Sequence, residues 1–292
     1  MFSTAYSEAT KYTRPIISLI RTYDGKVAAG IGSYVVLNQD GWILTAAHIL
    51  ALAHKAQMDA VNIQKRSQAV SQIESDVNLS HKVKKRTVRE LPLDDKWITH
   101  FSFVFAGSAA QISGQAAVDP AADIAVAKLN ALEGLNISGF PKFPRAGDVT
   151  APGTSLCTLG FPFQPLAATY DDKTNRFDLP QQQNIAFFPS EGIHTRNIGM
   201  EDQTSNPHRI IPFIETSSPG LKGQSGGPIV DVHGTVRALQ ARTTAYSLDV
   251  APTIKENGKE VKEHQFIQVG MGCAAEHICQ FLQIHQVAFE RL

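Results

Sequence analysis

The sequence has few cysteines, no net charge and no long apolar run, and each of these absences excludes a class of protein. Its three cysteines, Cys157, Cys273 and Cys279, are an odd and sparse set. We therefore expect small buried hydrophobic residues in a reducing compartment and not a disulfide framework. The 27 basic residues balance the 27 acidic ones, so the overall charge favours neither nucleic acid nor an anionic membrane as a partner. No apolar run reaches the length of about 20 residues that a membrane-spanning helix needs.

The sequence also lacks a secretion signal and a metal-ligand pattern. Its start, "MFSTAYSEATKYTRP", has no basic segment followed by an apolar core, which a signal peptide requires. Together with the sparse cysteines, this predicts a cytoplasmic protein. The ten histidines form no pair at ligand spacing, apart from His277 near Cys273, which we interpret as a chance feature of a helix. We therefore expect neither a metal nor a cofactor.

What the chain does contain is a series of short apolar runs separated by turn residues. With 43% apolar and 18% charged residues, its composition is that of a globular protein. The pattern predicts strands at 15–20, 27–37, 42–47, 97–106, 123–129, 155–161, 184–189, 209–215, 228–232, 235–240 and 265–270. Because these strands do not alternate regularly with helices, they favour an all-β antiparallel barrel or sandwich.

Several segments depart from the strand pattern. Residues 50–80 lack glycine and proline and carry apolar residues at loose helical spacing, so they predict one or two helices. The basic stretch "HKVKKRTVRE", residues 81–90, indicates a solvated face, with a nucleic-acid or partner surface as the alternative. Residues 164–182 indicate a long polar loop. An amphipathic helix is expected over 274–287.

The stretch "GLKGQSGGPIV", residues 220–230, places Ser225 between glycines. Such glycines occur in ordinary hairpin loops, but they are unfavourable in backbone entropy, and the pattern also suits a nucleophile held on a tight loop. The motif matches the G-x-S-x-G elbow of α/β-hydrolases, which needs a helix directly after the serine. Pro228 begins a strand-like apolar run instead, and little chain remains for an acid and a histidine. We therefore reject that elbow.

Upstream of Ser225 lie the two partners that an activated serine needs. The segment "GWILTAAHIL" places His48 at the end of an apolar strand, and "AADIAVAKL" places Asp123 at the head of another. Each residue alone is typical of a surface position or a turn. In the order His48, Asp123, Ser225 they resemble the trypsin-like (chymotrypsin-fold) serine peptidases. The T-A-A-H, D-I-A-x-x-x-L and G-x-S-G-G-P motifs of that family stand here as written.

Other segments are similar to the bacterial HtrA-like branch of that family. They are "GSYVVLNQDGWILTAAHIL", "TLGFPF", "EGIHTR" and "VGMGCAAEHICQFL". The resemblance implies two perpendicular six-stranded antiparallel β-barrels with the triad in the cleft between them. We expect a single peptidase domain over 1–292, with an N-terminal barrel at 1–135 that carries a helical insertion at about 50–95. The C-terminal barrel then occupies 136–292, and we expect no PDZ domain within this chain.

The resemblance also implies the chemistry. Ser225 is expected to attack the peptide carbonyl, His48 to take and return its proton, and Asp123 to orient the imidazole. The backbone N–H groups of Gly223 and Ser225 are expected to form the oxyanion hole. Gln224 stands where the digestive enzymes have an aspartate that pairs with a new N-terminus. Activation by cleavage is therefore not expected.

The same resemblance places the primary specificity pocket. Its base is expected at Pro219. Its wall is expected at Leu239, Gln240, Ala241 and Arg242. No acidic residue occurs from 216 to 230, so a substrate lysine or arginine would lack the buried partner that it needs there. We therefore expect a small or aliphatic residue before the scissile bond, with an acidic residue reached by Arg242 as the alternative.

These observations predict a serine endopeptidase that acts on a protein or peptide through an acyl-enzyme intermediate. The alternative is a catalytically silent pseudo-peptidase that keeps the fold as a protein-binding module. A third interpretation is a peptidase recruited to nucleic acid by residues 81–90. We expect neither a nucleic-acid nor a membrane partner, and the natural substrate and the oligomeric state stay open.

Overall fold

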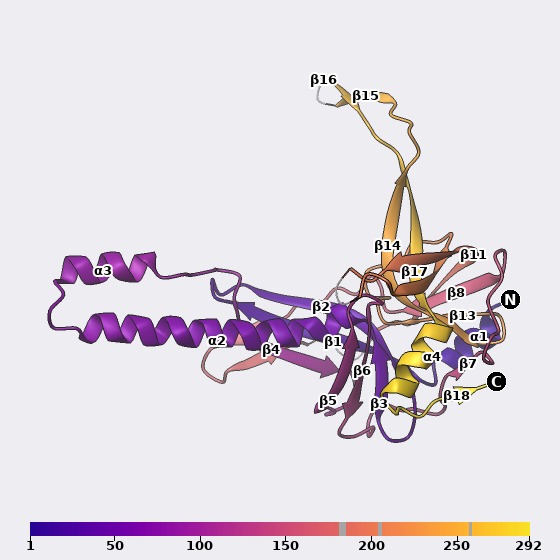
Figure 1. Ribbon diagram of the computed structural model, residues 1–292, viewed down its shortest axis with the longest axis horizontal. Coiled ribbons are helices and arrows are strands. Elements are labelled where there is room, and N and C mark those ends of the chain that lie inside the picture. Colours follow the sequence, from indigo (N-terminus) through magenta and orange to yellow (C-terminus); the bar gives the residue numbers. More distant parts are fainter. Residues whose placement is uncertain (181–184, 204–205, 257–258) are drawn as a thin grey trace.

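The structure is a computed structural model of the chain, and it describes all residues except 181–184, 204–205 and 257–258. Its body consists of two six-stranded antiparallel sheets that lie side by side, with long projections on two sides (Figure 1). Four helices are described, so the chain is β-rich but not purely β. A search of the described helices finds none with the length and apolar character to span a membrane.

The N-terminal sheet has the strand order β4-β1-β2-β3-β6-β5. The strands are β1 (Thr13–Thr22), β2 (Val27–Val36), β3 (Trp42–Thr45), β4 (Ile98–Phe105), β5 (Ile112–Asp119) and β6 (Ile124–Leu129). Its apolar core includes the fully buried side chains of Tyr34, Ile43 and Phe105. In the described structure β4 and β5 end the sheet without pairing with each other, so this sheet is open where the family resemblance implied a closed barrel.

The C-terminal sheet closes into a ring with the order β11-β12-β17-β14-β13-β8. Its strands are β8 (Ser155–Gly160), β11 (Phe188–Glu201), β12 (Ile210–Thr216), β13 (Pro228–Val230), β14 (Val236–Ser247) and β17 (Phe266–Ala274). Helices α1 (Ser3–Ala9) and α4 (Ala275–Ile284) pack against this ring and contribute buried side chains to its apolar core. The expected C-terminal helix is confirmed, because its apolar residues Ile278, Phe281 and Leu282 are buried. Helix α1 was not predicted.

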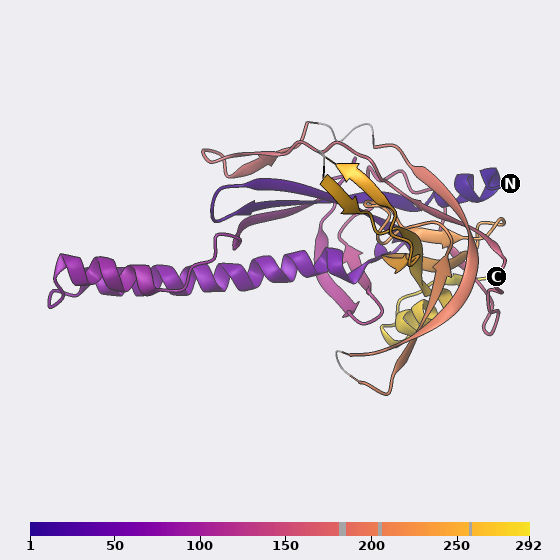
Figure 2. The same ribbon diagram turned by 90° about the horizontal axis from the view of Figure 1, so that it is seen from above.

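The helical insertion is present as α2 (Ala47–Ser75) and α3 (His81–Glu90). Helix α2 begins three residues earlier than predicted, and its first half lies along β4. Its second half and α3 extend beyond the sheet as a helical hairpin (Figures 1 and 2). No residue of α3 is buried, which agrees with the solvated basic face expected for this stretch.

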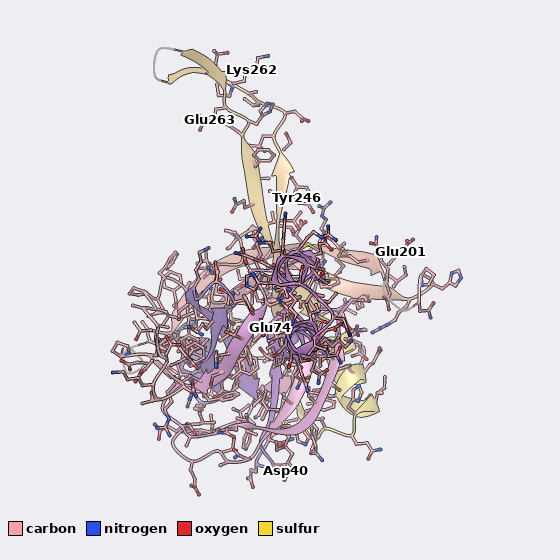
Figure 3. The ribbon with its side chains drawn as sticks, turned by 90° about the vertical axis from the view of Figure 1, so that its left-hand side faces the viewer. Asp40, Glu74, Glu201, Tyr246, Lys262 and Glu263 are labelled. Atoms are coloured by element: carbon pink, nitrogen blue, oxygen red, sulfur yellow. The ribbon has the colours of Figure 1, made fainter. Side chains whose placement is uncertain are left out.

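Two further projections differ from the sequence-based expectations. The segment expected as a polar loop contains a hairpin, β9 (Thr169–Asp171) and β10 (Arg176–Asp178), and Leu179 after it packs on Ile17 and Leu19. Strands β14 and β17 run on past the ring as an arm that ends in β15 (Thr253–Glu256) and β16 (Lys259–Lys262). In Figure 3, Tyr246 lies near the start of this arm, and Lys262 and Glu263 lie near its end.

The predicted strand at 184–189 begins at Phe188, and residue 184 lies outside the described residues. A short parallel pair joins β7 (Lys142–Phe143) to β18 (Glu290–Arg291).

Candidate active site

His48 and Asp123 come together because β3 and β6 are neighbours in the N-terminal sheet. Thr45, the last residue of β3, pairs with Ala125 of β6. His48 then lies in the first turn of α2, and Asp123 lies directly before β6. The Ala47 N–H donates to the carbonyl of Asp123 over 3.2 Å, which ties the two chain segments together at this point.

The imidazole of His48 contacts the carboxylate of Asp123 through Nδ1. Nδ1 lies 2.9 Å from Oδ2 and 3.1 Å from Oδ1. The backbone N–H of His48 also donates to Oδ1 over 3.0 Å. The Asp123 side chain is 13% exposed and the His48 side chain 52% exposed. With the proton on Nδ1 held by this carboxylate, Nε2 carries the free lone pair and can act as a base.

Asp123 adopts a left-handed backbone conformation with φ of +53°. This region is sparsely populated by residues other than glycine, although aspartate enters it more readily than most. Such a conformation persists where neighbouring contacts hold it. The Asp123 N–H donates to the carbonyl of Pro120 over 3.3 Å, which closes a tight turn between β5 and β6.

The Ser225 loop belongs to the C-terminal ring but packs against the N-terminal sheet. The buried Ser33 of β2 forms the bridge: its N–H donates to the Ser225 carbonyl and its hydroxyl to the Gly223 carbonyl, each over 2.8 Å. Gly226, with φ of +79°, faces the same sheet. A Cβ atom at Gly226 would overlap the Ser33 carbonyl oxygen and would lie 2.8 Å from the N of Ala46. The glycine is therefore needed for this close approach of the two sheets.

Ser225 is half-buried and lies next to the segment that carries His48. Within the described part of the chain, no hydrogen bond joins the Ser225 hydroxyl to the His48 imidazole. The contact through which a base would take the serine proton is thus not formed in this structure. Catalytic hydrogen bonds are often long before substrate binds.

The backbone N–H groups of the Ser225 loop divide into two sets. Those of Gln224, Gly226 and Gly227 donate to the carbonyls of Leu221, Gln240 and Gln224, over 2.9, 2.8 and 2.8 Å. Those of Gly223 and Ser225 donate to no acceptor among the described residues. Unpaired backbone donors in a packed loop are unfavourable unless water or a ligand satisfies them. Two such donors on either side of one residue are able to hold a developing oxyanion.

Gly223 is the residue that permits this loop shape. Its φ is +105°, a conformation that other residues rarely adopt. A Cβ atom there would overlap the carbonyl oxygen of Phe161 and would lie 3.0 Å from the Cα of Pro162. The Phe161 N–H donates to the Gly223 carbonyl over 3.1 Å, so the loop is fixed against the segment after β8.

The residues expected to form the specificity pocket lie in different environments. Leu239 and Ala241 are buried in the apolar core of the ring, so their side chains do not face a substrate. The guanidinium of Arg242 stacks 5.0 Å from the ring of Phe213 and donates to the Ala121 carbonyl over 3.5 Å. Pro219 is half-buried.

Gln240 fills the space behind the Ser225 loop. Its side chain is buried, and Nε2 donates to the Arg242 carbonyl over 2.9 Å. A Cβ atom at Gly220 would overlap Nε2, which shows how closely the amide packs on the loop before Ser225. Oε1 has no hydrogen-bond partner within the described structure. The sequence-based expectation named Gln240 but could not foresee that its side chain occupies this space.

The three cysteines are held in environments that make their thiols unreactive. All three are buried and unpaired. Burial raises the pKa of the Cys157 thiol to about 11 and that of Cys279 to about 12, and it raises the pKa of Cys273 as well. Because the thiolate is the reactive species, these cysteines are inert near neutral pH.

Comparisons with known proteins identify the fold and the family of the chain. Two solved structures of an alanine variant of the HtrA-type protease AlgW, one with a tripeptide and one with a decapeptide, share the fold, each with a TM-score of 0.50 and 14% identity. The alignments include 97% and 98% of this chain and 62% and 68% of theirs. At this identity the likeness shows the fold alone. No curated protein matches the chain. The family described as "Trypsin-like peptidase domain" matches residues 32–239, well over half of the sequence, and the chain therefore belongs to the trypsin-like peptidases.

Proposed function

We propose that the protein is a serine endopeptidase that uses His48, Asp123 and Ser225. The observation that carries the proposal is the pair of unpaired N–H groups, on Gly223 and Ser225, beside a serine that lies next to a histidine–aspartate pair. A fold kept only for binding has no need of donors held open at this point. The AlgW structures contain bound peptides, and we propose a peptide or protein substrate for this chain as well.

The residues would act in the following way. The Ser225 hydroxyl attacks the peptide carbonyl while Nε2 of His48 takes its proton, and the Asp123 carboxylate stabilises the imidazolium that forms. The N–H groups of Gly223 and Ser225 hold the negative oxygen of the tetrahedral intermediate. His48 then gives its proton to the leaving amine. Water hydrolyses the resulting acyl-enzyme in a second, similar cycle.

The residue before the scissile bond is proposed to be small or aliphatic. The buried Gln240 side chain limits the depth of the space behind the Ser225 loop. Arg242, which could have received an acidic side chain, is already engaged with Ala121 and Phe213. Shape then dominates selection, and one methylene changes the relative rate by about 10- to 200-fold.

A pseudo-peptidase is the second candidate, since no hydrogen bond joins Ser225 to His48 in the described structure. Hydrolysis of a peptide library separates the two candidates. We expect the wild-type protein to cleave after small or aliphatic residues, and Ser225→Ala to lose this activity by orders of magnitude while it keeps its circular dichroism spectrum. Equal rates for the wild-type protein and Ser225→Ala, or no cleavage by either, contradict the proposed peptidase function.

A further inference from the structure

Asp119, four residues before Asp123, is held by the opposite half of the molecule. It ends β5, and its carboxylate is 5% exposed. Arg209, which directly precedes β12, forms an ion pair with its Oδ2 atom, and Nε2 of His277 on α4 lies 3.0 Å from the same atom. Both partners belong to the C-terminal half, whereas Asp119 belongs to the N-terminal sheet. The Asp119 carboxylate therefore lies where the end of β5 meets α4 and the residue before β12.

The same carboxylate also organises the turn that ends at Asp123. Its Oδ1 accepts a hydrogen bond from the Ala122 N–H over 3.3 Å. From the other side, Arg242 of β14 donates to the Ala121 carbonyl over 3.5 Å. The segment from Asp119 to Asp123 is thus fixed at both its start and its middle by residues of the C-terminal half.

Burial raises the pKa of Asp119, but hydrogen bonds from His277, Arg209 and the Ala122 N–H outweigh burial and bring it to about 2. The carboxylate is therefore charged at neutral pH, and the ion pair with Arg209 is present. A buried charge with good partners keeps a fixed geometry, because any displacement leaves it unpaired.

Asp123 needs such support for two reasons. Its left-handed backbone conformation is less favourable than the extended or helical alternatives. Its carboxylate must also face His48, whereas Ser225 is carried by the other half of the molecule. A link between the β5–β6 turn and the C-terminal half sets the position of the histidine–aspartate pair relative to the serine.

We infer that Arg209 and Asp119 are positioning residues for Asp123, which act across the two halves of the molecule and touch neither substrate nor Ser225. The inference rests on the proposed peptidase function. Small displacements of a catalytic group reduce rates by about 10- to 100-fold, so Arg209→Gln is expected to lower kcat by that factor while KM for the same peptide changes little. Arg209→Lys, which keeps the charge, is expected to recover part of the loss.

A double-mutant comparison separates positioning from general destabilisation. In an Asp123→Ala background the positioned group is gone, so Arg209→Gln is expected to have no further effect on kcat. Arg209 bridges two carboxylates, because it pairs with the buried Asp202 as well as with Asp119. Arg237→Gln is the matched control, because Arg237 likewise bridges two carboxylates, Asp148 and Asp231, within the C-terminal half. It is expected to lower thermal stability and leave kcat unchanged. Asp119→Asn, which keeps the acceptor for the Ala122 N–H, repeats the test should Arg209→Gln not fold.

Three results would overturn the inference: wild-type kcat in Arg209→Gln, an equal loss of kcat in the Asp123→Ala background, or the same loss in Arg237→Gln. If the wild-type protein cleaves no peptide, the proposed function fails, and the crystal structure of Arg209→Gln tests the positioning by itself. We expect Asp123 to leave hydrogen-bond reach of His48 in that crystal. An unchanged Asp123–His48 contact would overturn the inference without any assay of turnover.

Discussion

Replacement of Asp119 by asparagine is expected to change how the stability of the protein depends on pH. The pKa of this carboxyl is 3.8 in the unfolded chain and about 2 in the folded protein. Between these values the unfolded state binds more protons than the folded state, so the free energy of unfolding rises with pH. The contribution of the carboxylate is therefore complete above about pH 4 and is lost as the pH falls toward 2.

The magnitude follows from the shift. One pKa unit corresponds to about 1.4 kcal/mol, so a shift of nearly two units contributes about 2 kcal/mol of stability. Asp119 is buried, and solvent screening removes little of this value. The asparagine variant lacks the group that titrates. The difference in unfolding free energy between the wild-type protein and Asp119→Asn is therefore expected to shrink by about 2 kcal/mol between neutral pH and pH 2.

Urea unfolding followed by circular dichroism, at several values between pH 2 and pH 7, measures this difference. Asp40→Asn is the matched control, because Asp40 is exposed and its carboxylate forms no ion pair or hydrogen bond among the described residues. A carboxylate without such partners in the folded state adds little pH-dependent stability, so the Asp40 variant is expected to follow the wild-type curve closely. A difference between the wild-type protein and Asp119→Asn that stays constant across this pH range would refute the reasoning.

Two further predictions concern packing around the Ser225 loop. Gln240→Ala is expected to raise the ratio of kcat/KM for peptides with leucine to kcat/KM for peptides with alanine before the scissile bond by about tenfold. The control is Gln280→Ala at an exposed position, which is expected to leave this ratio unchanged. An unchanged ratio in Gln240→Ala would contradict the assigned pocket. Gly226→Ala is expected to destabilise the protein more than Gly147→Ala in thermal unfolding. Both glycines have φ of +79°, but only at Gly226 would the added Cβ meet other atoms within 4 Å, so equal losses would mean that backbone strain alone accounts for the effect.

Local patterns in the sequence predicted the parts of the fold that depend on neighbouring residues. The apolar run before His48 and the one after Asp123 form β3 and β6, and their pairing brings the two side chains into contact. The glycines around Ser225 predicted a tight loop, and the structure has Gly223 in the conformation that the loop needs. The assignment of roles to these residues came from the family resemblance and not from periodicity.

Contacts between distant segments could not be predicted in this way. Asp119 and His277 are 158 positions apart, and Asp119 and Arg209 are 90 positions apart. No pattern in a single sequence links these residues, because each of them, taken alone, is typical of an ordinary turn, surface or helix position. The direction of the Gln240 side chain could not be predicted either, because a β-bulge between Gln240 and Arg242 interrupts the alternation of inward and outward side chains along β14.

Reaction with a fluorophosphonate probe tests the central claim most directly, because the probe bonds only to a serine that a nearby base activates. Peptide mapping by mass spectrometry locates the adduct. We predict one adduct, on Ser225, in the folded wild-type protein, with no labelling of Ser225→Ala and a strong reduction in His48→Ala. A folded wild-type protein that stays unlabelled under conditions that label a trypsin standard, or that is labelled at another residue, would contradict the account.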